Sequence, residues 1–324
     1  MKVIDLKKGD SVEGIDLLVE KKQDGIAKNG KPYANVTLRD KTGSISGKIW
    51  EDVLVRCQTS ALQEGNVISV SGAIEEYNSS LQFRITDFAG SFTSPDEFMK
   101  KSTFSIDEMW SHVVELIGTM KEPLTKYICE ELILNEQFSV AYKAAPAAKA
   151  VHNAWVGGLL EHVHSLCTIA EPVIRHYQTR YCEKISRDKV LFGIMIHDAG
   201  KIIEYGEAPA FNYTTVGKFV NHMVLGPAWV YEIANRFPNK GENFKIERAN
   251  LMHILAAHHG KIEWGSPVKP SSLEAILVHH LDNLDSKMLH ALDFVKGKPG
   301  KIPGFSETSR FELTEFWNYS LEGK

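Results

Sequence analysis

The chain has few cysteines and no long apolar run. Its four cysteines, Cys57, Cys129, Cys167 and Cys182, are scattered over 324 residues without a Cys-x-x-Cys pair. This spacing argues against a zinc knuckle and a disulfide framework, and it is typical of reduced thiols. No apolar stretch approaches the roughly 18–20 residues of a membrane span, and residues 1–8 lack the apolar core of a signal peptide. We therefore expect a cytoplasmic protein without a membrane partner.

Positive charge is not in excess either. The formal net charge is −4, and residues 1–95 contain twelve Lys and Arg against thirteen Asp and Glu. Proteins that capture nucleic acid by bulk electrostatics usually carry a basic domain. Nucleic-acid binding would therefore require a local groove. The length of 324 residues predicts two domains.

Residues 1–92 have the pattern of a small β domain. Apolar and polar residues alternate over residues 34–40, a turn follows, and residues 45–50 resume the alternation as a hairpin partner. Residues 12–19, 67–72 and 81–85 are further candidate strands. About five short strands joined by glycine-containing turns predict a small barrel or sandwich.

The rest of the chain has a helical pattern up to about residue 295. We expect residues 93–104 to be a linker, residues 105–295 to be all-α, and residues 296–324, which contain several Gly and Pro, to be irregular. Ser271 and Glu274 have the spacing of a capping box, which predicts a helix start. The predicted apolar stripe of this helix is Leu273, Ile276, Leu277, Leu281 and Leu284, with His279, Asp282 and Asp285 on a neighbouring face.

Histidine and aspartate recur through the helical region. His197 and Asp198 end the apolar run of residues 191–196. Further candidates at helix positions are His162, His222, His258, His259 and Asp282. Borderline metals such as Mn²⁺, Fe²⁺ and Zn²⁺ accept imidazole and carboxylate ligands together. A mixed set drawn from several helices is what a hydrolytic metal site in a helical domain needs. The pattern indicates a metal-dependent phosphohydrolase.

The order of these residues adds a resemblance to a known family. His, His-Asp, His, His, Asp over residues 162–282 resembles the HD-domain metal-dependent phosphohydrolases. The segments 157–162, 197–201, 258–260 with 265–267, and 282–285 are similar to those of the YhaM family of 3′→5′ exoribonucleases. In that family an OB-type nucleic-acid-binding domain precedes the HD domain. Residues 30–43 and Trp50 are similar to the OB strands, so the resemblance covers nearly the whole chain and implies an OB-like β-barrel followed by an all-α HD domain.

The resemblance implies roles for the site residues. His162, His197, Asp198 and Asp282 match the four-residue HD ligand set, and His222 and His258 match the ligands of a second metal, with Asp198 bridging. His259 remains an alternative to the favoured His258, and Asp285 remains an alternative to Asp282. The implied cofactor is Mn²⁺ or another divalent transition metal, as one or two ions. The implied reaction hydrolyses the terminal phosphodiester at the 3′ end of single-stranded RNA and releases nucleoside 5′-monophosphates.

Lys201 is a candidate for a direct role beside Asp198. It follows His197 by four residues and Asp198 by three, so one helical face can hold all three side chains. An ammonium group there could hold the substrate phosphate or stabilise developing charge. We therefore expect Asp198 and Lys201 to be catalytic.

The N-terminal domain would grip the nucleic acid. OB folds bind single strands by stacking bases on aromatic rings and by contacting phosphates with basic residues. The candidate contacts are Tyr33, Trp50, Lys31, Arg39, Lys48 and Arg84, with Tyr77 and Phe83 as further aromatics. Trp50 and Phe83 could instead belong to the barrel core, because both alternate with polar residues. The expected partner is single-stranded RNA, with single-stranded DNA left open.

Other functions share parts of this pattern. An HD phosphohydrolase acting on free nucleotides would use the same metal site without needing an OB domain. A nucleic-acid-binding protein could keep the HD domain as a scaffold only, but the complete ligand order argues against this. A cyclic-dinucleotide phosphodiesterase would need an Asp-Gly pair that is missing from residues 260–267. A homo-oligomer could bury the C-terminal segment, and the sequence leaves the number of subunits open.

Overall fold

The computed structural model of the protein divides into two compact units. The structure describes residues 1–78, 80–148, 155–181, 184–206, 211–297, 303–309 and 312–318. One unit comprises Met1–Lys100 with Gly206–Asn212, and the other comprises Lys101–Tyr205 with Tyr213–Lys324. Cys182 lies outside the described residues. Among the described helices, none is both long enough and apolar enough to cross a membrane.

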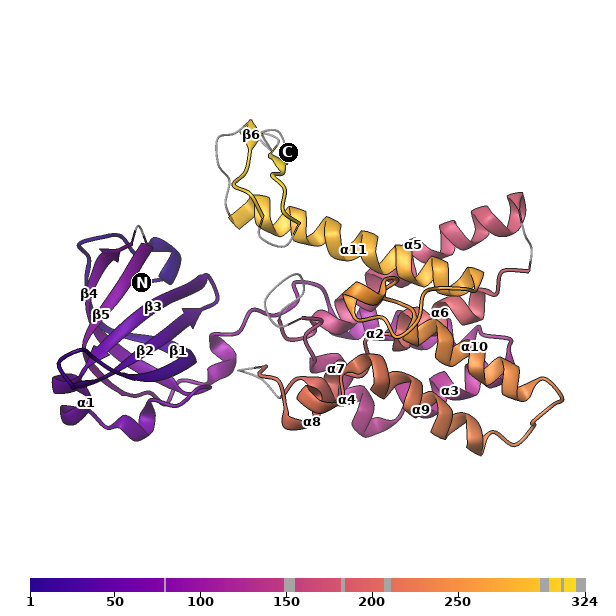
Figure 1. The fold of residues 1–324 in the computed structure, drawn as a ribbon, viewed down its shortest axis with the longest axis horizontal. Coiled ribbons are helices and arrows are strands. Elements are labelled where there is room, and N and C mark those ends of the chain that lie inside the picture. The colour runs from indigo at the N-terminus through magenta and orange to yellow at the C-terminus, as the bar shows by residue number, and fades with distance from the viewer. Residues whose placement is uncertain are drawn as a thin grey trace. The chain divides into compact units, whose positions relative to one another are not determined.

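The first unit contains a closed β-barrel with the strand order β1-β2-β3-β5-β4 (Figure 1). The strands are β1 (Ser11–Ile26), β2 (Pro32–Asp40), β3 (Gly43–Trp50), β4 (Val67–Tyr77) and β5 (Ser80–Gly90). β3 and β5 pair in parallel, and the other neighbours are antiparallel. Short helical segments accompany them: η1 (Val3–Asp5), α1 (Glu51–Arg56), η2 (Thr59–Ala61) and η3 (Pro95–Glu97). The OB-like barrel is confirmed, and each of its strands is longer than predicted.

The alternation of side chains along β2 and β3 decides which residues reach solvent. The buried members, which face the barrel core, include Ala34, Val36, Leu38, Ile45 and Ile49. Because successive side chains point to opposite faces of a strand, Tyr33, Lys48 and Trp50 point outward. These two strands therefore present an aromatic and basic face outside the barrel.

The second unit is helical, as predicted. Its elements are α2 (Ile106–Gly118), α3 (Pro123–Ile133), α4 (Glu136–Ala144), α5 (Gly158–Arg180), α6 (Arg187–Ile196), α7 (Lys201–Glu204), α8 (Thr215–Phe219), α9 (His222–Arg236), α10 (Phe244–Ala256), η4 (Ile262–Trp264) and α11 (Leu273–Gly297). The strands β6 (Gly304–Phe305) and β7 (Trp317–Asn318) form a small antiparallel pair near the C-terminus.

Helix α6 is the centre of this unit. It packs against α3, α5, α10 and α11, and all residues from Val190 to Ile196 are buried. A helix that is apolar on every side is stable only when neighbours surround it. Gly193 allows the closest approach, because a Cβ atom there would lie 2.6 Å from Ile254 and 2.7 Å from Val278. The end of α6 therefore delivers the residues that follow it into the protein interior.

Two details predicted for α11 were wrong. Ser272, not Ser271, caps the helix by accepting a hydrogen bond from the Ala275 backbone N–H, and Glu274 instead accepts from the Ser186 N–H. The predicted apolar stripe is correct only in part. Leu281 is buried and Leu277 packs against the core, whereas Leu273, Ile276 and Leu284 are exposed. The buried face also contains Ala275, Val278, His279 and Asp285. Two polar side chains of α11 thus point inward, and one of them, Asp285, belongs to the site described below.

Replacing Asp40 tests the hydrogen bonds that link η1 to the turn between β2 and β3. The Asp40 carboxylate accepts hydrogen bonds from the backbone N–H groups of Val3, Thr42 and Gly43. Burial raises the pKa of Asp40, but these hydrogen bonds and that of the Thr42 hydroxyl outweigh burial and lower it. The stabilisation is therefore present above the carboxyl's ordinary pKa of about 4 and is lost as the pH falls through the lowered value.

We expect Asp40→Ala to lower the free energy of unfolding by about 1–3 kcal/mol at pH 7, because several buried or partly buried donors lose their acceptor. Denaturant unfolding monitored by circular dichroism measures this. The exposed Asp52 supplies the control, and Asp52→Ala should change the free energy by less than about 0.5 kcal/mol. Equal stability of the two variants would contradict the role given to Asp40.

Candidate metal centre and nucleic-acid surface

The ends of helices bring the predicted metal ligands together in the second unit. His197 is the C-cap residue of α6, and Asp198 follows it directly. His222 is the first residue of α9, and His258 and His259 follow the end of α10. The N-terminus of α9 packs tightly on Gly200, where a Cβ atom would lie 2.7 Å from His222 Cα. Consecutive side chains can face one centre at such helix ends because the regular rotation of 100° per residue stops there.

Three of the histidines are oriented by backbone carbonyl groups. His197 Nδ1 lies 2.8 Å from the Ile194 oxygen, His258 Nδ1 lies 2.7 Å from the Leu255 oxygen, and His259 Nδ1 lies 2.9 Å from the Trp264 oxygen. A carbonyl oxygen only accepts, so Nδ1 donates in each pair. In the neutral ring Nε2 then keeps its lone pair. These contacts leave three Nε2 atoms available as metal ligands.

Carboxylates orient the other two histidines. Glu204 accepts hydrogen bonds from both His222 Nδ1 (2.6 Å) and the His222 backbone N–H (2.8 Å). Asp285 accepts from His162 Nδ1 at 2.8 Å, and its second oxygen accepts from the Ser165 hydroxyl at 2.6 Å. Carboxylates bound to the second ring nitrogen are the usual outer partners of metal-ligating histidines. Asp285 thus supports His162, whereas Asp282 faces the His162 Nε2 atom at 3.2 Å.

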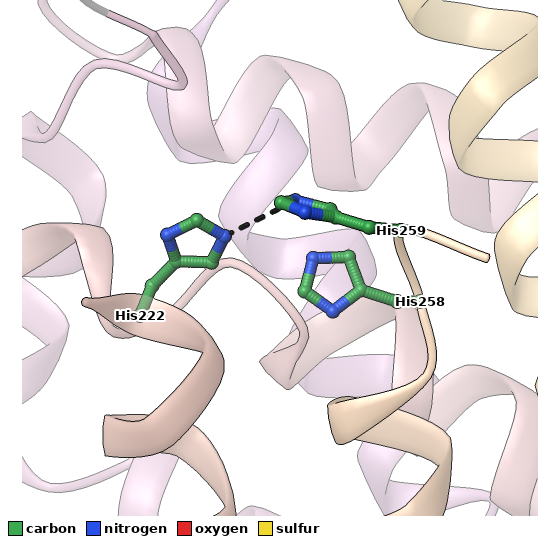
Figure 2. A group of neighbouring side chains, drawn as sticks. All are labelled: His222, His258 and His259. Atoms are coloured by element: carbon green, nitrogen blue, oxygen red, sulfur yellow. Dashed lines mark hydrogen bonds between the residues drawn. The ribbon is translucent and has the colours of Figure 1, made fainter. Parts of the chain in front are cut away.

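The donor atoms form two neighbouring clusters. In one, the donor atoms of His162, His197 and Asp282 all lie within 4.8 Å of one another, and in the other the same holds for His222, His258 and His259. Figure 2 shows the second cluster, where the three imidazole rings converge and His222 Nε2 lies 3.3 Å from His259 Nε2. The structure therefore brings His258 and His259 into the same cluster instead of selecting one of them.

Asp198 lies between the two clusters. One of its oxygens lies 3.4 Å from His197 Nε2, and the other lies 3.6 Å from His222 Nε2 and 3.8 Å from His258 Nε2. Each carboxylate oxygen thus faces a different cluster. This is the arrangement that a carboxylate bridging two metal ions requires.

Two buried nitrogen atoms without a hydrogen-bond partner indicate that a metal ion fits between the donor side chains. The Nε2 atoms of His197 and His258 are buried and have no hydrogen-bond partner among the described residues. Burying a polar atom without a partner costs roughly 1–3 kcal/mol, so such atoms need an explanation. Both belong to the donor clusters, and a divalent cation bound there would satisfy both. The residues present fit a metal ion.

Most of the donor side chains are in the protonation state that binds a metal cation. Burial raises the pKa of Asp198, but the Lys201 ammonium and His197 outweigh burial and hold it well below its ordinary range. Burial likewise raises the pKa of Asp282, and the hydrogen bond from His162 outweighs it, so the pKa is lowered. Burial is the main cause that lowers the pKa of His258 well below its ordinary value. At neutral pH the carboxylates are ionised and His258 is neutral, which are the forms that bind metal.

His162 differs from the other donors. Burial lowers its pKa, but hydrogen bonds with Asp282 and Asp285 outweigh burial and raise the pKa to about 9. In the absence of a cation this imidazole therefore carries a proton at neutral pH. A metal ion that binds His162 would displace that proton.

Lys201 contacts the site through Asp198. Its ammonium nitrogen lies 2.6 Å from Asp198 Oδ2 and 2.5 Å from the Ala147 carbonyl oxygen, and the side chain is largely buried. The predicted proximity of Lys201 to Asp198 is thus present. A buried ammonium beside the carboxylate keeps the carboxylate ionised and fixes its orientation.

Sequence reasoning did not single out Glu204 or Ser165. Glu204 is buried at the end of α7, six residues after Asp198, and no known spacing links it to His222. Ser165 lies one turn after His162 on α5, a separation that places both on one helix face. That spacing could have suggested Ser165, whereas only the tertiary structure reveals Glu204.

A groove on the barrel contains several of the predicted nucleic-acid contacts. It has a volume of about 750 Å³, and its lining includes Lys48, Trp50, Tyr77 and Arg84. Lys48 Nζ lies 4.3 Å from the ring centroids of both Tyr33 and Trp50. Trp50 is 40% exposed. An exposed ring and a half-buried ring with an ammonium group close to both suit base stacking combined with phosphate contact.

The remaining barrel candidates have acidic partners or are buried. Lys31 pairs with Glu51 at 2.8 Å, Arg39 with Glu20 at 3.2 Å, and Arg84 with Glu75 at 2.5 Å. Phe83 is fully buried in the barrel core, so of the two alternatives left open for it, the core position is confirmed and the contact with a base is wrong. Lys48 lies over two aromatic rings and, among the described residues, has no acidic side chain within 4 Å of its ammonium nitrogen, which makes it the strongest basic candidate.

Removing Glu204 tests its support of His222. We expect Glu204→Ala to weaken divalent-metal affinity by about 10- to 100-fold, because His222 loses the acceptor that fixes its ring. Glu204→Gln, which keeps one oxygen acceptor, should lose less. Calorimetric titration with Mn²⁺ measures the affinity. The exposed Glu247 on α10 provides the control variant Glu247→Ala. A folded Glu204→Ala protein with unchanged metal affinity would contradict this role.

Comparison with known proteins agrees with the two units. Residues 17–89 match the family described as "OB-fold nucleic acid binding domain", and residues 159–287 match the "HD domain" family. A structure of the second OB-fold domain and a structure of a domain of replication protein A, both from Methanococcus maripaludis, match with 24% and 20% identity. Each match covers 29% of this chain and 96% or 97% of the other chain, with a TM-score of 0.24.

A curated relative covers almost the entire chain. The 3′-5′ exoribonuclease YhaM of Geobacillus sp. (strain WCH70) is 30% identical over 306 residues, which are 93% of this chain and 90% of that protein. The match includes both the OB and the HD regions, in the same order. With this coverage, and with the histidines and aspartates gathered as an HD domain requires, the chain belongs to the YhaM family of OB- and HD-domain proteins.

Proposed function

We propose that this protein is a metal-dependent 3′→5′ exoribonuclease. The observation that carries the proposal is the pair of donor clusters on either side of Asp198, with the buried Nε2 atoms of His197 and His258 lacking hydrogen-bond partners within the described part of the chain. Membership of the YhaM family supplies the direction of cleavage and the RNA substrate. The products would be nucleoside 5′-monophosphates.

The proposed metal ligands are His162, His197, Asp198 and Asp282 for one ion, and His222, His258 and Asp198 for a second ion, with His259 beside it. An imidazole-rich set favours a transition metal such as Mn²⁺ over Mg²⁺, which prefers oxygen ligands. Divalent cations bound there would neutralise the non-bridging oxygens of a phosphodiester and make water a stronger nucleophile.

The protein's own residues would hold these charges in place. Lys201 keeps Asp198 ionised through its contact at 2.6 Å, and Glu204 and Asp285 fix the rings of His222 and His162. Preorganised charges of this kind need no rearrangement when charge develops on the substrate. Asp198 and Lys201 are therefore the proposed catalytic pair, with Lys201 acting mainly through Asp198.

The barrel face around Lys48, Tyr33 and Trp50 is the proposed RNA-binding surface. Single-stranded RNA is the proposed partner, and single-stranded DNA would be a second substrate if 2′-hydroxyl groups are not recognised. We propose domain limits of 1–92 and 105–295, joined by residues 93–104, and a cytoplasmic location. Free nucleotides and cyclic dinucleotides are less favoured substrates, because neither would need the OB domain.

Digestion of RNA labelled at its 5′ end tests the activity. With Mn²⁺ the wild-type protein should produce a ladder that shortens from the 3′ end. Asp198→Ala should lower the rate by at least about 100-fold, because both clusters lose their shared carboxylate. Intact RNA alongside hydrolysis of nucleoside triphosphates would contradict the substrate, and a ladder of equal rate in the variant would contradict the site.

Replacing Trp50 tests the RNA-binding surface. We expect Trp50→Ala to weaken the binding of single-stranded RNA by roughly 5- to 150-fold, because stacking is worth about 1–3 kcal/mol per base. Fluorescence anisotropy in EDTA measures binding without hydrolysis. The fully exposed Phe92 lies outside the groove, so Phe92→Ala is the matched control. Equal dissociation constants for the two variants would exclude Trp50 from the surface.

A further inference from the structure

The segment between α10 and α11 carries an exposed tryptophan next to the metal centre. Trp264 is the last residue of η4 and is 45% exposed. Its backbone carbonyl oxygen accepts the hydrogen bond from His259 Nδ1 at 2.9 Å. The Trp264 backbone therefore contacts the cluster of His222, His258 and His259 directly, through the His259 ring.

The indole ring lies near the part of α11 that carries Asp282, the one member of the other cluster on this helix. The ring centroid is 6.3 Å from that of the His279 ring, and Lys287 Nζ lies 5.8 Å from it. Asp282 stands between His279 and Lys287 in the sequence of the helix. The backbone of Trp264 thus contacts one donor cluster, while its ring lies beside the helix that supplies Asp282 to the other.

The backbone around Trp264 is held firmly. Gly260 has a φ of +78°, and a Cβ atom there would lie 2.1 Å from the His279 ring, so only glycine fits. Ser266 is buried, its hydroxyl donates to the Ala256 oxygen at 3.0 Å, and its N–H donates to the Lys261 oxygen at 3.1 Å. A ring exposed on a fixed segment can bind a flat ligand with little loss of conformational entropy.

Two ammonium groups accompany the ring. Lys261 Nζ lies 4.3 Å from the Trp264 ring centroid, and Lys287, which also pairs with Glu312 at 3.5 Å, approaches the same ring. Aromatic rings that stack on bases, combined with cations that contact phosphates, are the general means of binding single-stranded nucleic acid. This combination therefore occurs a second time in the chain, at the metal centre.

We propose that the Trp264 ring stacks on the base of the 3′-terminal nucleotide of the RNA and that Lys261 contacts the adjoining phosphate. This inference rests on the proposed exoribonuclease function and names a residue that positions its substrate. Because every base has a π-face, such a platform accepts all four bases. It would hold the terminal nucleotide so that the phosphodiester on its 5′ side reaches the two donor clusters.

A comparison of two substrates and several variants tests the proposal. The substrates are RNAs of one sequence that end in either a normal 3′ nucleotide or a 3′ ribose without a base. The wild type should degrade the RNA with the normal 3′ nucleotide about 10 times faster, in a single turnover, than the RNA without the terminal base. This ratio of rates should fall to about 1 in Trp264→Ala and recover in part in Trp264→Phe. Tyr231 is the matched control. Tyr231 is an exposed residue of α9, nine residues after His222, and the guanidinium carbon of Arg248 lies 4.2 Å from its ring centroid. Tyr231→Ala should keep the wild-type ratio of rates.

The possible outcomes separate this inference from the proposed function. A wild type that degrades no RNA would contradict the exoribonuclease itself. A Trp264→Ala protein that degrades both substrates with the wild-type ratio would overturn the platform alone. Equal losses on both substrates, with the ratio unchanged, would assign Trp264 a structural role and also overturn it.

Photo-crosslinking gives a second readout that requires no turnover. RNA with 5-iodouridine at its 3′ end is irradiated with the full-length protein in EDTA, and the crosslinked peptide is identified by mass spectrometry. The expected crosslink is to the peptide that contains Trp264, and it should disappear in Trp264→Ala. Crosslinks confined to the barrel residues would overturn the proposal.

Discussion

The hydrogen bond on the Nδ1 side of each imidazole is the interaction on which the proposed metal centre depends. His197, His258 and His259 donate to backbone carbonyl groups, and His162 and His222 bind carboxylates. Each bond fixes both the plane of the ring and the nitrogen that faces the centre. Without them, the Nε2 atoms would not converge.

These contacts require helix ends at defined places in the interior. α6 is buried on every side and stops where His197 and Asp198 are needed, while α9 begins with His222 packed against Gly200. The apolar core around α6 stabilises the fold enough to tolerate buried polar atoms without partners, each of which costs roughly 1–3 kcal/mol. The site therefore combines a cost in stability with readiness to bind a cation, a common feature of functional sites.

Much of the architecture could be predicted from local patterns. Alternation along residues 34–40 and 45–50 identified strands of the barrel, because inward and outward positions of a strand differ in polarity. The stripe predicted for α11 was wrong at Leu273, Ile276 and Leu284, which are exposed, while His279 and Asp285 are buried. Hydrophobic periodicity fails where a helix directs polar side chains into a site.

The candidate site, too, could be predicted from the sequence only in part. Its histidines and aspartates could be predicted from their order in the chain, but the grouping of His258 with His259 and the support of His222 by Glu204 depend on tertiary contacts. No spacing along the sequence encodes a contact between α7 and the start of α9. For Phe83 the sequence pattern allowed either the barrel core or the outer face, and the structure places the side chain in the core.

Diffraction from crystals soaked in Mn²⁺, recorded at a wavelength where manganese scatters anomalously, tests the central claim most directly. We expect one peak bounded by His162, His197 and Asp282 and a second bounded by His222, His258 and His259, each roughly 2.2 Å from the Nε2 atoms. Asp198 should lie between the two peaks. Manganese bound elsewhere, with both donor clusters empty, would show that these side chains are not the metal ligands.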